Sequence, residues 1–194
     1  KFLSPSYTDI SVGIDWKPNS IFSLYLSPVA GQITTAYVGD AVETANPGLR
    51  QQMWDKYGTW AYSKTANPDG TYDKVYKNCK AELGLTFKGS INYTYKDLKI
   101  ITSLGLFTPY TWDKTEMFDA NGDFIGYRDN NRRFGNFDVD WDAAISYQFL
   151  KCLNVTLSTS LKYYNGVKIA NKDGIAAERV QFKGVLGLGV GYSF

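Results

Sequence analysis

Histidine is absent from the 194 residues, and cysteine is limited to Cys79 and Cys152. Without histidine the chain has no imidazole base for a Ser-His-Asp triad, no histidine ligand for a metal and no histidine pH switch. Neither sign of charge is in excess, because 21 Lys+Arg stand against 19 Asp+Glu for a net charge of +2. This balance argues against a nucleic-acid-binding protein, which needs a broad positive field.

Long apolar runs are missing as well. The mean hydropathy is −0.29, and no stretch approaches the roughly 20 apolar residues that a transmembrane helix needs. Aromatic residues are abundant instead, with 15 Tyr, 11 Phe and 5 Trp against only 2 Met. This composition favours β structure. The length suits one domain, which we expect to cover residues 1–194.

Alternation of apolar and polar residues dominates the chain. Over residues 137–149 every odd position is apolar and nearly every even position is polar, which predicts a strand with one apolar and one polar face. Several such runs exceed the roughly 5–6 residues of a usual soluble strand. Seven strands are predicted, at about 7–16, 22–26, 83–95, 98–112, 137–149, 153–163 and 180–194.

The connections between these runs alternate between short and long. Short turns lie at 17–19, 96–97 and 150–152, and long segments lie at about 29–78, 113–136 and 165–179. This plan is typical of an antiparallel up-and-down transmembrane β-barrel of the bacterial outer membrane, with periplasmic turns and extracellular loops. Such barrels have an even number of strands, so at least one more strand is expected upstream of Lys1. The chain is then the C-terminal part of a larger barrel.

Aromatic residues cluster near both ends of the expected strands, where lipid headgroups would lie. The turn-side girdle is expected to contain Trp16, Tyr93, Tyr95, Tyr147, Phe149, Tyr192 and Phe194. The loop-side girdle is expected to contain Tyr110, Trp112, Phe137, Trp141 and Tyr163. In the alternative, a soluble barrel or sandwich, the apolar face is simply the core. That alternative has to explain the long strands and an outer face rich in Ser, Thr and Gly.

Six blocks of sequence carry a family resemblance: FLSPSY at 2–7, VGIDWKPN at 12–19, SLYLSP at 23–28, ELG at 82–84, LFTPY at 106–110 and FDVDW at 137–141. They resemble a Bacteroidota family of outer-membrane proteins of unknown function. The resemblance implies an outer-membrane location and further residues upstream. A further block at the end of the sequence, GVGYSF at 189–194, looks like the signal that barrel-assembly machinery recognises. Membrane lipid and, through the long loops, other envelope proteins are further expected partners.

The polar face is where a pore or a binding function would lie. The expected lumen-facing residues are Lys80, Glu82, Lys88, Asp138, Asp140, Asp142, Lys162, Arg179 and Lys183. They form either a channel lining that selects solutes by charge or a set of ion pairs that fills a narrow lumen. Mixed signs on neighbouring strands favour the ion pairs. The aspartates are spaced about 7 Å apart along their strand, too far to share one cation, so we expect no metal or cofactor.

The segment 29–80 is expected to contain strand extensions at 33–38 and 71–76 and a short helix at 49–57. Its aromatic residues either contact a glycan or a protein or pack within the loop; they are Trp54, Tyr57, Trp60, Tyr62 and Tyr72. The motifs NPDG at 67–70 and DANGD at 119–123 predict turns, not calcium loops. Cys79 and Cys152 are expected at opposite membrane faces, too far apart for a disulfide.

The leading interpretation is a non-enzymatic outer-membrane protein that acts as a pore or as a structural subunit of an envelope complex. Two other kinds of function remain as alternatives to it. The first is an outer-membrane lipid hydrolase with its catalytic residues outside this segment. Barrel lipases and deacylases pair serine with histidine, which this segment lacks. The second is a soluble, lipocalin-like binding barrel. The transported solute, the total number of strands and the oligomeric state do not follow from the sequence.

Overall fold

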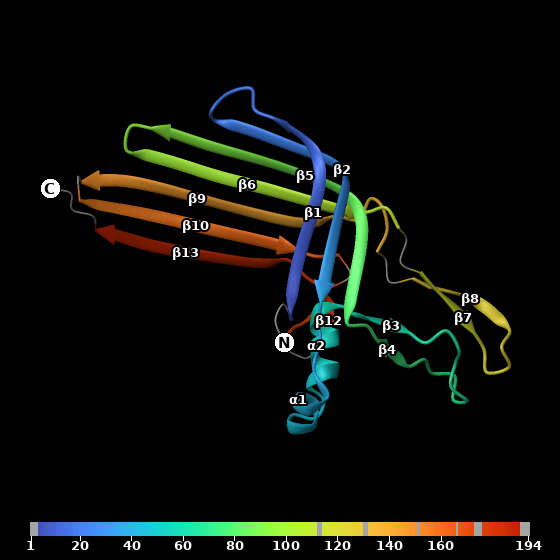
Figure 1. Ribbon diagram of the computed structural model, residues 1–194. Coiled ribbons are helices and arrows are strands. Elements are labelled where there is room, and N and C mark those ends of the chain that lie inside the picture. Colours follow the sequence, from blue (N-terminus) through green and yellow to red (C-terminus); the bar gives the residue numbers. More distant parts are fainter. Residues whose placement is uncertain are drawn as a thin grey trace.

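One antiparallel sheet of seven strands, ordered β1-β2-β5-β6-β9-β10-β13, forms the centre of the computed structural model. The structure describes residues 4–111, 114–129, 132–150, 152–165, 167–172 and 176–190. The predicted antiparallel strands are confirmed, and each lies beside its neighbour in the chain (Figure 1). They are β1 (Ser6–Trp16), β2 (Phe22–Thr35), β5 (Cys79–Tyr95), β6 (Leu98–Pro109), β9 (Asp138–Leu150), β10 (Leu153–Tyr163) and β13 (Gln181–Val190).

The sheet is open along two edges. Within the described residues β1 pairs only with β2, and β13 pairs only with β10. Over the described residues the seven strands therefore form a curved antiparallel sheet, and closure into a barrel is not shown.

The alternating sequence sets the register of the sheet. Trp141 in β9 lies opposite Leu104 in β6 and Leu161 in β10, while its neighbour Asp142 lies opposite Ser103 and Ser160. Apolar side chains therefore stand on one face and polar side chains on the other. The apolar face is largely uncovered.

Two bulges bend the N-terminal part of the sheet. The pairing shifts between Val12 and Ile14 in β1 and between Ser27 and Ala30 in β2. Bulges increase the local bend and twist of a strand. A Cβ atom at Gly13 would collide with the backbone of Leu26, so this bulge needs glycine. In Figure 1, the first part of β1, the last part of β2 and the start of β5 turn sharply away from the direction of the other strands.

The smaller elements gather at the loop-side end of the sheet (Figure 1). Helix α2 (Leu49–Tyr57) confirms the helix expected at 49–57, and β2 ends at Thr35 without reaching 38. The strand expected over 71–76 is shorter, and it pairs with a strand that the sequence did not indicate. The remaining elements are α1 (Asp40–Ala45) and the hairpins β3 (Trp60–Tyr62) with β4 (Lys74–Tyr76), β7 (Lys114–Phe118) with β8 (Phe124–Asp129), and β11 (Lys168–Ala170) with β12 (Ala176–Glu178).

Both predicted turns are present. Gly70 and Gly122 adopt φ values of 78° and 92°, which glycine reaches without steric cost. The carboxylate of Asp119 accepts hydrogen bonds from the backbone N–H groups of Asn121 and Asp123, so it stabilises its own turn. Cys79 and Cys152 are free thiols, as expected. No helix within the described ranges is long and apolar enough to cross a membrane.

Candidate functional site

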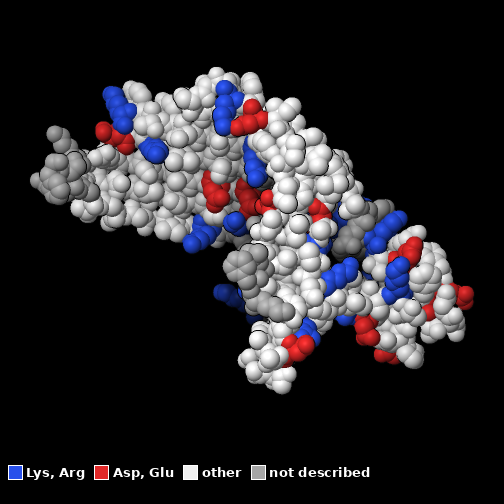
Figure 2. Space-filling model, in the orientation of Figure 1, with Lys and Arg blue, Asp and Glu red and all other residues white. Residues whose placement is uncertain are grey.

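The polar face of the sheet is concave. A hollow of about 580 Å³ is lined by Asp9 and Ser11 of β1 and, at its other side, by Lys162 of β10. Four strands separate β1 from β10 in the sheet order, so the sheet must curve around the hollow for both to line it. Figure 2 shows acidic side chains gathered over the middle of β9, with basic side chains beside them.

The register places eight of the nine expected lumen-facing residues on this hollowed face; they are Lys80, Glu82, Lys88, Asp138, Asp140, Asp142, Lys162 and Lys183. The prediction for Arg179 stays a prediction, because this residue lies outside the seven strands. Strand β13 begins at Gln181, so Arg179 precedes it, and its Nε donates a hydrogen bond to the carbonyl of Ile169 at 3.3 Å. The apolar alternation of this last run begins at Val180, one residue before the first residue of β13. The alternation alone therefore placed the start of the strand too early.

Arg132 is the centre of a buried charged cluster at the loop-side end of this face. Although it carries a charge, this residue is only 4% exposed. Its Nε and Nη2 donate to the two carboxylate oxygens of Glu82 at 2.6 and 3.0 Å. Its Nη1 and Nη2 donate to the two oxygens of Asp138 at 2.7 and 2.8 Å. One guanidinium thus binds two carboxylates in bidentate geometry, the strongest form of this interaction.

Further hydrogen bonds complete the cluster. Nη1 of Arg132 also donates to the carbonyl of Asn165 at 2.6 Å, and the backbone N–H of Asn165 donates to Asp138 at 2.8 Å. Lys80 lies 3.3 Å from Glu82. Burial would lower the pKa of Arg132, but the hydrogen bonds and charges of Asp138 and Glu82 outweigh it and raise the pKa. An arginine side chain is not deprotonated in proteins, so the cluster holds a guanidinium cation.

A second polar cluster lies one step further into the face. Asp140 pairs with Lys162 at 3.0 Å and accepts a hydrogen bond from the hydroxyl of Tyr164 at 2.9 Å. Burial and this hydrogen bond raise the pKa of Tyr164 to about 12. Tyr163, expected in the loop-side girdle, donates a hydrogen bond from its hydroxyl group to the carboxylate of Glu178 at 3.1 Å. Charged and hydroxyl groups at the loop-side end of the polar face are therefore mostly paired with one another, although Oδ1 of Asn165 is buried without a hydrogen-bond partner among the described residues.

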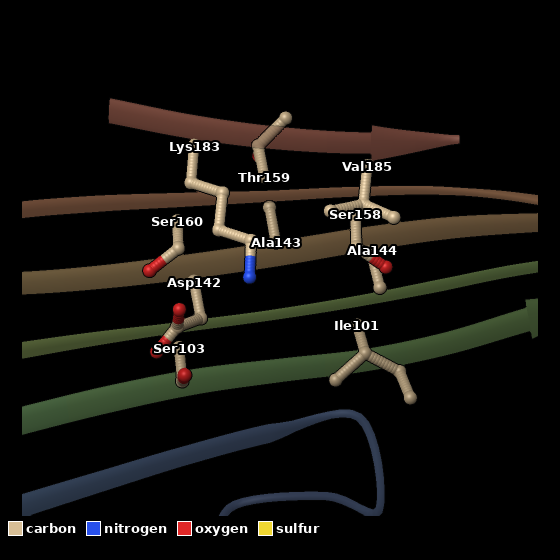
Figure 3. Close-up of a pocket in the computed structure, with 10 residues that line it drawn as sticks. All are labelled: Ile101, Ser103, Asp142, Ala143, Ala144, Ser158, Thr159, Ser160, Lys183 and Val185. Carbon is tan, nitrogen blue, oxygen red and sulfur yellow. The ribbon is translucent and has the colours of Figure 1, made fainter. Parts of the chain in front are cut away.

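The centre of the polar face is more open. A shallow pocket of about 320 Å³ lies between β6, β9, β10 and β13. In Figure 3, Lys183 extends from β13 across Ser160 toward Asp142 on β9. Ala144 and Val185 line the same pocket, so its floor is partly apolar. Within the described ranges no three His, Cys, Asp or Glu side chains are grouped to hold a metal ion.

Most of the expected girdle residues lie on the uncovered face. Exposed aromatic side chains near the turns are Trp16, Tyr93, Tyr95, Tyr147 and Phe149, and those nearer the loops are Tyr110, Phe137 and Trp141. Trp112, Tyr192 and Phe194 lie outside the described residues.

The aromatic residues of the segment 29–80 pack within the loops. The Trp54 ring stacks on Tyr76 at 4.2 Å, Lys74 covers Trp60 at 4.5 Å, and Arg128 covers Tyr62 at 3.7 Å. Tyr7 lies against Tyr57, and Tyr72 hydrogen-bonds the carbonyl of Phe118. These contacts favour self-packing over a glycan-binding or protein-binding surface.

No family model, curated protein or solved structure matches the chain. The family resemblance noted in the sequence therefore stays a prediction, and the site has to be interpreted from its own geometry. Sequence reasoning missed Arg132, which lies in the aperiodic stretch DNNRRF at 129–134 beside a second arginine. Nothing in that stretch distinguishes the buried arginine from its exposed neighbour Arg133.

Proposed function

We propose that this chain is a non-enzymatic integral protein of a bacterial outer membrane, and that its seven-stranded sheet is part of the wall of a transmembrane β-barrel. The observation that carries the proposal is the uncovered apolar face. Seven apolar residues from both edges and from the middle of the sheet are each at least 45% exposed on this face. They are Val12 73%, Ile14 75%, Ile145 45%, Leu157 46%, Phe182 64%, Leu186 70% and Leu188 75%. Soluble monomers rarely expose one apolar face of this extent.

The distribution of polarity argues against the soluble alternative. A lipocalin-like barrel fills its concave side with apolar side chains and turns polar residues to water. Here the hollow is lined by Asp140, Asp142, Lys88 and Lys162, whereas the opposite face carries Leu, Val and Ile. This inside-out arrangement is that of a membrane barrel, whose strands alternate apolar outward and polar inward.

The open edges specify what else the wall needs. Unpaired backbone N–H and C=O groups are very costly in hydrocarbon, so a sheet in lipid has no free edge. The proposal therefore requires further strands that pair with β1 and β13. The resemblance to Bacteroidota outer-membrane proteins agrees with this, since those proteins carry further residues upstream.

Within the proposal, the ion pairs of the polar face bear on whether the barrel is a pore or a structural subunit of an envelope complex. Lys162 neutralises Asp140, and Arg132 together with Lys80 neutralises Glu82 and Asp138. Paired charges leave little net field to select ions by sign. A pore of this kind would discriminate mainly by size.

Tryptophan quenching tests the membrane location directly. The full-length protein is expressed in a Gram-negative host, its outer membrane is washed with alkaline carbonate, and the purified protein is reconstituted into vesicles with brominated acyl chains. Trp141 lies on the apolar face, whereas Trp54 stacks on Tyr76 in the loops. We expect bromine quenching that falls in Trp141→Phe and is unchanged in the control Trp54→Phe. Release of the protein by carbonate, or absence of quenching, would refute the proposal.

A further inference from the structure

The connection between β6 and β9 carries a charge into the interior. Arg132 belongs to this connection, yet its side chain is 5% exposed, and the carboxylates that it binds are 13% exposed in Glu82 and 8% exposed in Asp138. A buried charge is costly unless it is paired and hydrogen-bonded throughout. This pairing therefore fixes the connection in one place.

The arginine joins segments that are far apart in the sequence. Glu82 lies near the start of β5, Asp138 begins β9, and the acceptor carbonyl of Asn165 follows the end of β10. A second attachment lies three residues further on, where the backbone N–H of Gly135 donates to Oγ1 of the fully buried Thr108 at 2.9 Å. The connection is thus held at two points across four strands.

These attachments lie at the boundary of the polar hollow. Asp138 and Phe107 both line the hollow, and the Arg132 guanidinium lies 5.9 Å from the centre of the Phe107 ring. The segment that Arg132 anchors therefore borders the loop-side end of the hollow.

We propose that Arg132 is a latch: it holds the β6–β9 connection across the loop-side end of the polar hollow and closes that end to solutes. The physical basis is the sharing of one guanidinium between two carboxylates. Without it, Glu82 keeps only Lys80 and Asp138 keeps only the Asn165 N–H as partners among the described residues. The two carboxylates then lack the shared cation that holds them together, and the connection is released. The passage of solutes rests on the proposed membrane function, whereas the attachment of the connection does not.

Three variants of the full-length protein isolate the latch. Arg132→Gln removes the charge, and Arg133→Gln makes the same change at the adjacent, exposed position. Arg132→Gln combined with Glu82→Gln and Asp138→Asn also removes the two carboxylates, and it serves if the single variant does not fold. Folding of each variant in detergent is checked by the shift in gel mobility on heating in SDS.

Chymotrypsin digestion tests the attachment. Phe134 and Phe137 follow Arg132 closely, and their side chains are exposed. A protease also needs an extended backbone on both sides of the cleaved bond, so rapid cleavage there requires the connection to open at its two attachments. Since cleavage reports the population of the open form, we expect Arg132→Gln and the triple variant to be cut about tenfold faster or more. Arg133→Gln should be cut at the parent rate. Equal cleavage of all four proteins overturns the latch.

Planar-bilayer conductance tests the closure. A larger or more frequent conductance in Arg132→Gln and the triple variant than in the parent and Arg133→Gln supports the closed end. Faster cleavage with a conductance equal to that of a conducting parent overturns closure. Faster cleavage with no conductance in any protein supports the attachment and refutes the pore, so the two proposals fail separately.

Discussion

A charge placed on the apolar face distinguishes lipid from water as the medium around the sheet. Leu157 lies in the middle of β10, opposite Ile145 in β9 and Leu186 in β13, and all three side chains are largely uncovered. We predict that Leu157→Lys destabilises the protein in bilayers. Its neighbour Ser158 lines the shallow pocket of the polar face, so Ser158→Lys is a control with the same added charge.

The expected magnitude follows from where these side chains lie. A lysine at the lipid-facing midplane of a membrane barrel costs about 2–4 kcal/mol, and the cost falls to about 0–1 kcal/mol near the interface. Leu153 is the first residue of β10, beside the short turn, so Leu153→Lys should cost little. On a soluble protein, an exposed Leu157→Lys would change the stability by only about 0.5 kcal/mol in either direction.

Equilibrium unfolding in vesicles, with urea and tryptophan fluorescence, measures these free energies. Leu157→Lys should lower the free energy of unfolding by about 2–4 kcal/mol, and Leu153→Lys should lower it by much less. The reasoning would be refuted if Leu157→Lys lowered the free energy of unfolding no more than Leu153→Lys does. A larger cost for Ser158→Lys than for Leu157→Lys would reverse the assignment of the two faces.

Three further changes probe the packing. Gly84→Ala should destabilise by about 1–3 kcal/mol through overpacking, because a Cβ atom there would collide with the Thr108 backbone; a thermal midpoint equal to that of the parent contradicts this. Thr108→Val should cost about 0.5–1.5 kcal/mol by removing the hydrogen bond that the Gly135 N–H donates to Oγ1, measured by urea unfolding. Maleimide labelling in denaturant without reductant should modify both Cys79 and Cys152, and a count below two would indicate a disulfide.

The sheet could be predicted because its information is local. In β9, alternation over thirteen residues fixes the strand, and its neighbours repeat the pattern at the same period. Short elements carry no such signal, so the pairing of the three-residue strands β3 and β4 emerged only with the loop contacts around them. The start of β13 was predicted too early for a related reason. Val180 continues the apolar alternation, but the pairing with β10 begins only at Gln181.

The buried arginine marks the other limit. Arg132 and Arg133 are chemically identical neighbours. The structure buries Arg132 between two carboxylates, which come from positions 50 residues upstream and 6 residues downstream, whereas Arg133 is exposed. Which arginine turns inward depends on the path of the connection across the sheet. Closure of the sheet into a barrel is likewise a property of how its edges meet, about which alternation along single strands carries no information.

The strictly neighbouring order of the strands makes the sheet modular. Its short turns define the hairpins β1–β2, β5–β6 and β9–β10, while the long connections between them carry the α-helices and small hairpins. A backbone cut within residues 63–73 therefore leaves every hairpin of the large sheet intact on one fragment or the other. Two separately expressed pieces would meet along the β2–β5 ladder of the large sheet and along the short β3–β4 ladder of the loops, which makes this position suited to complementation from fragments.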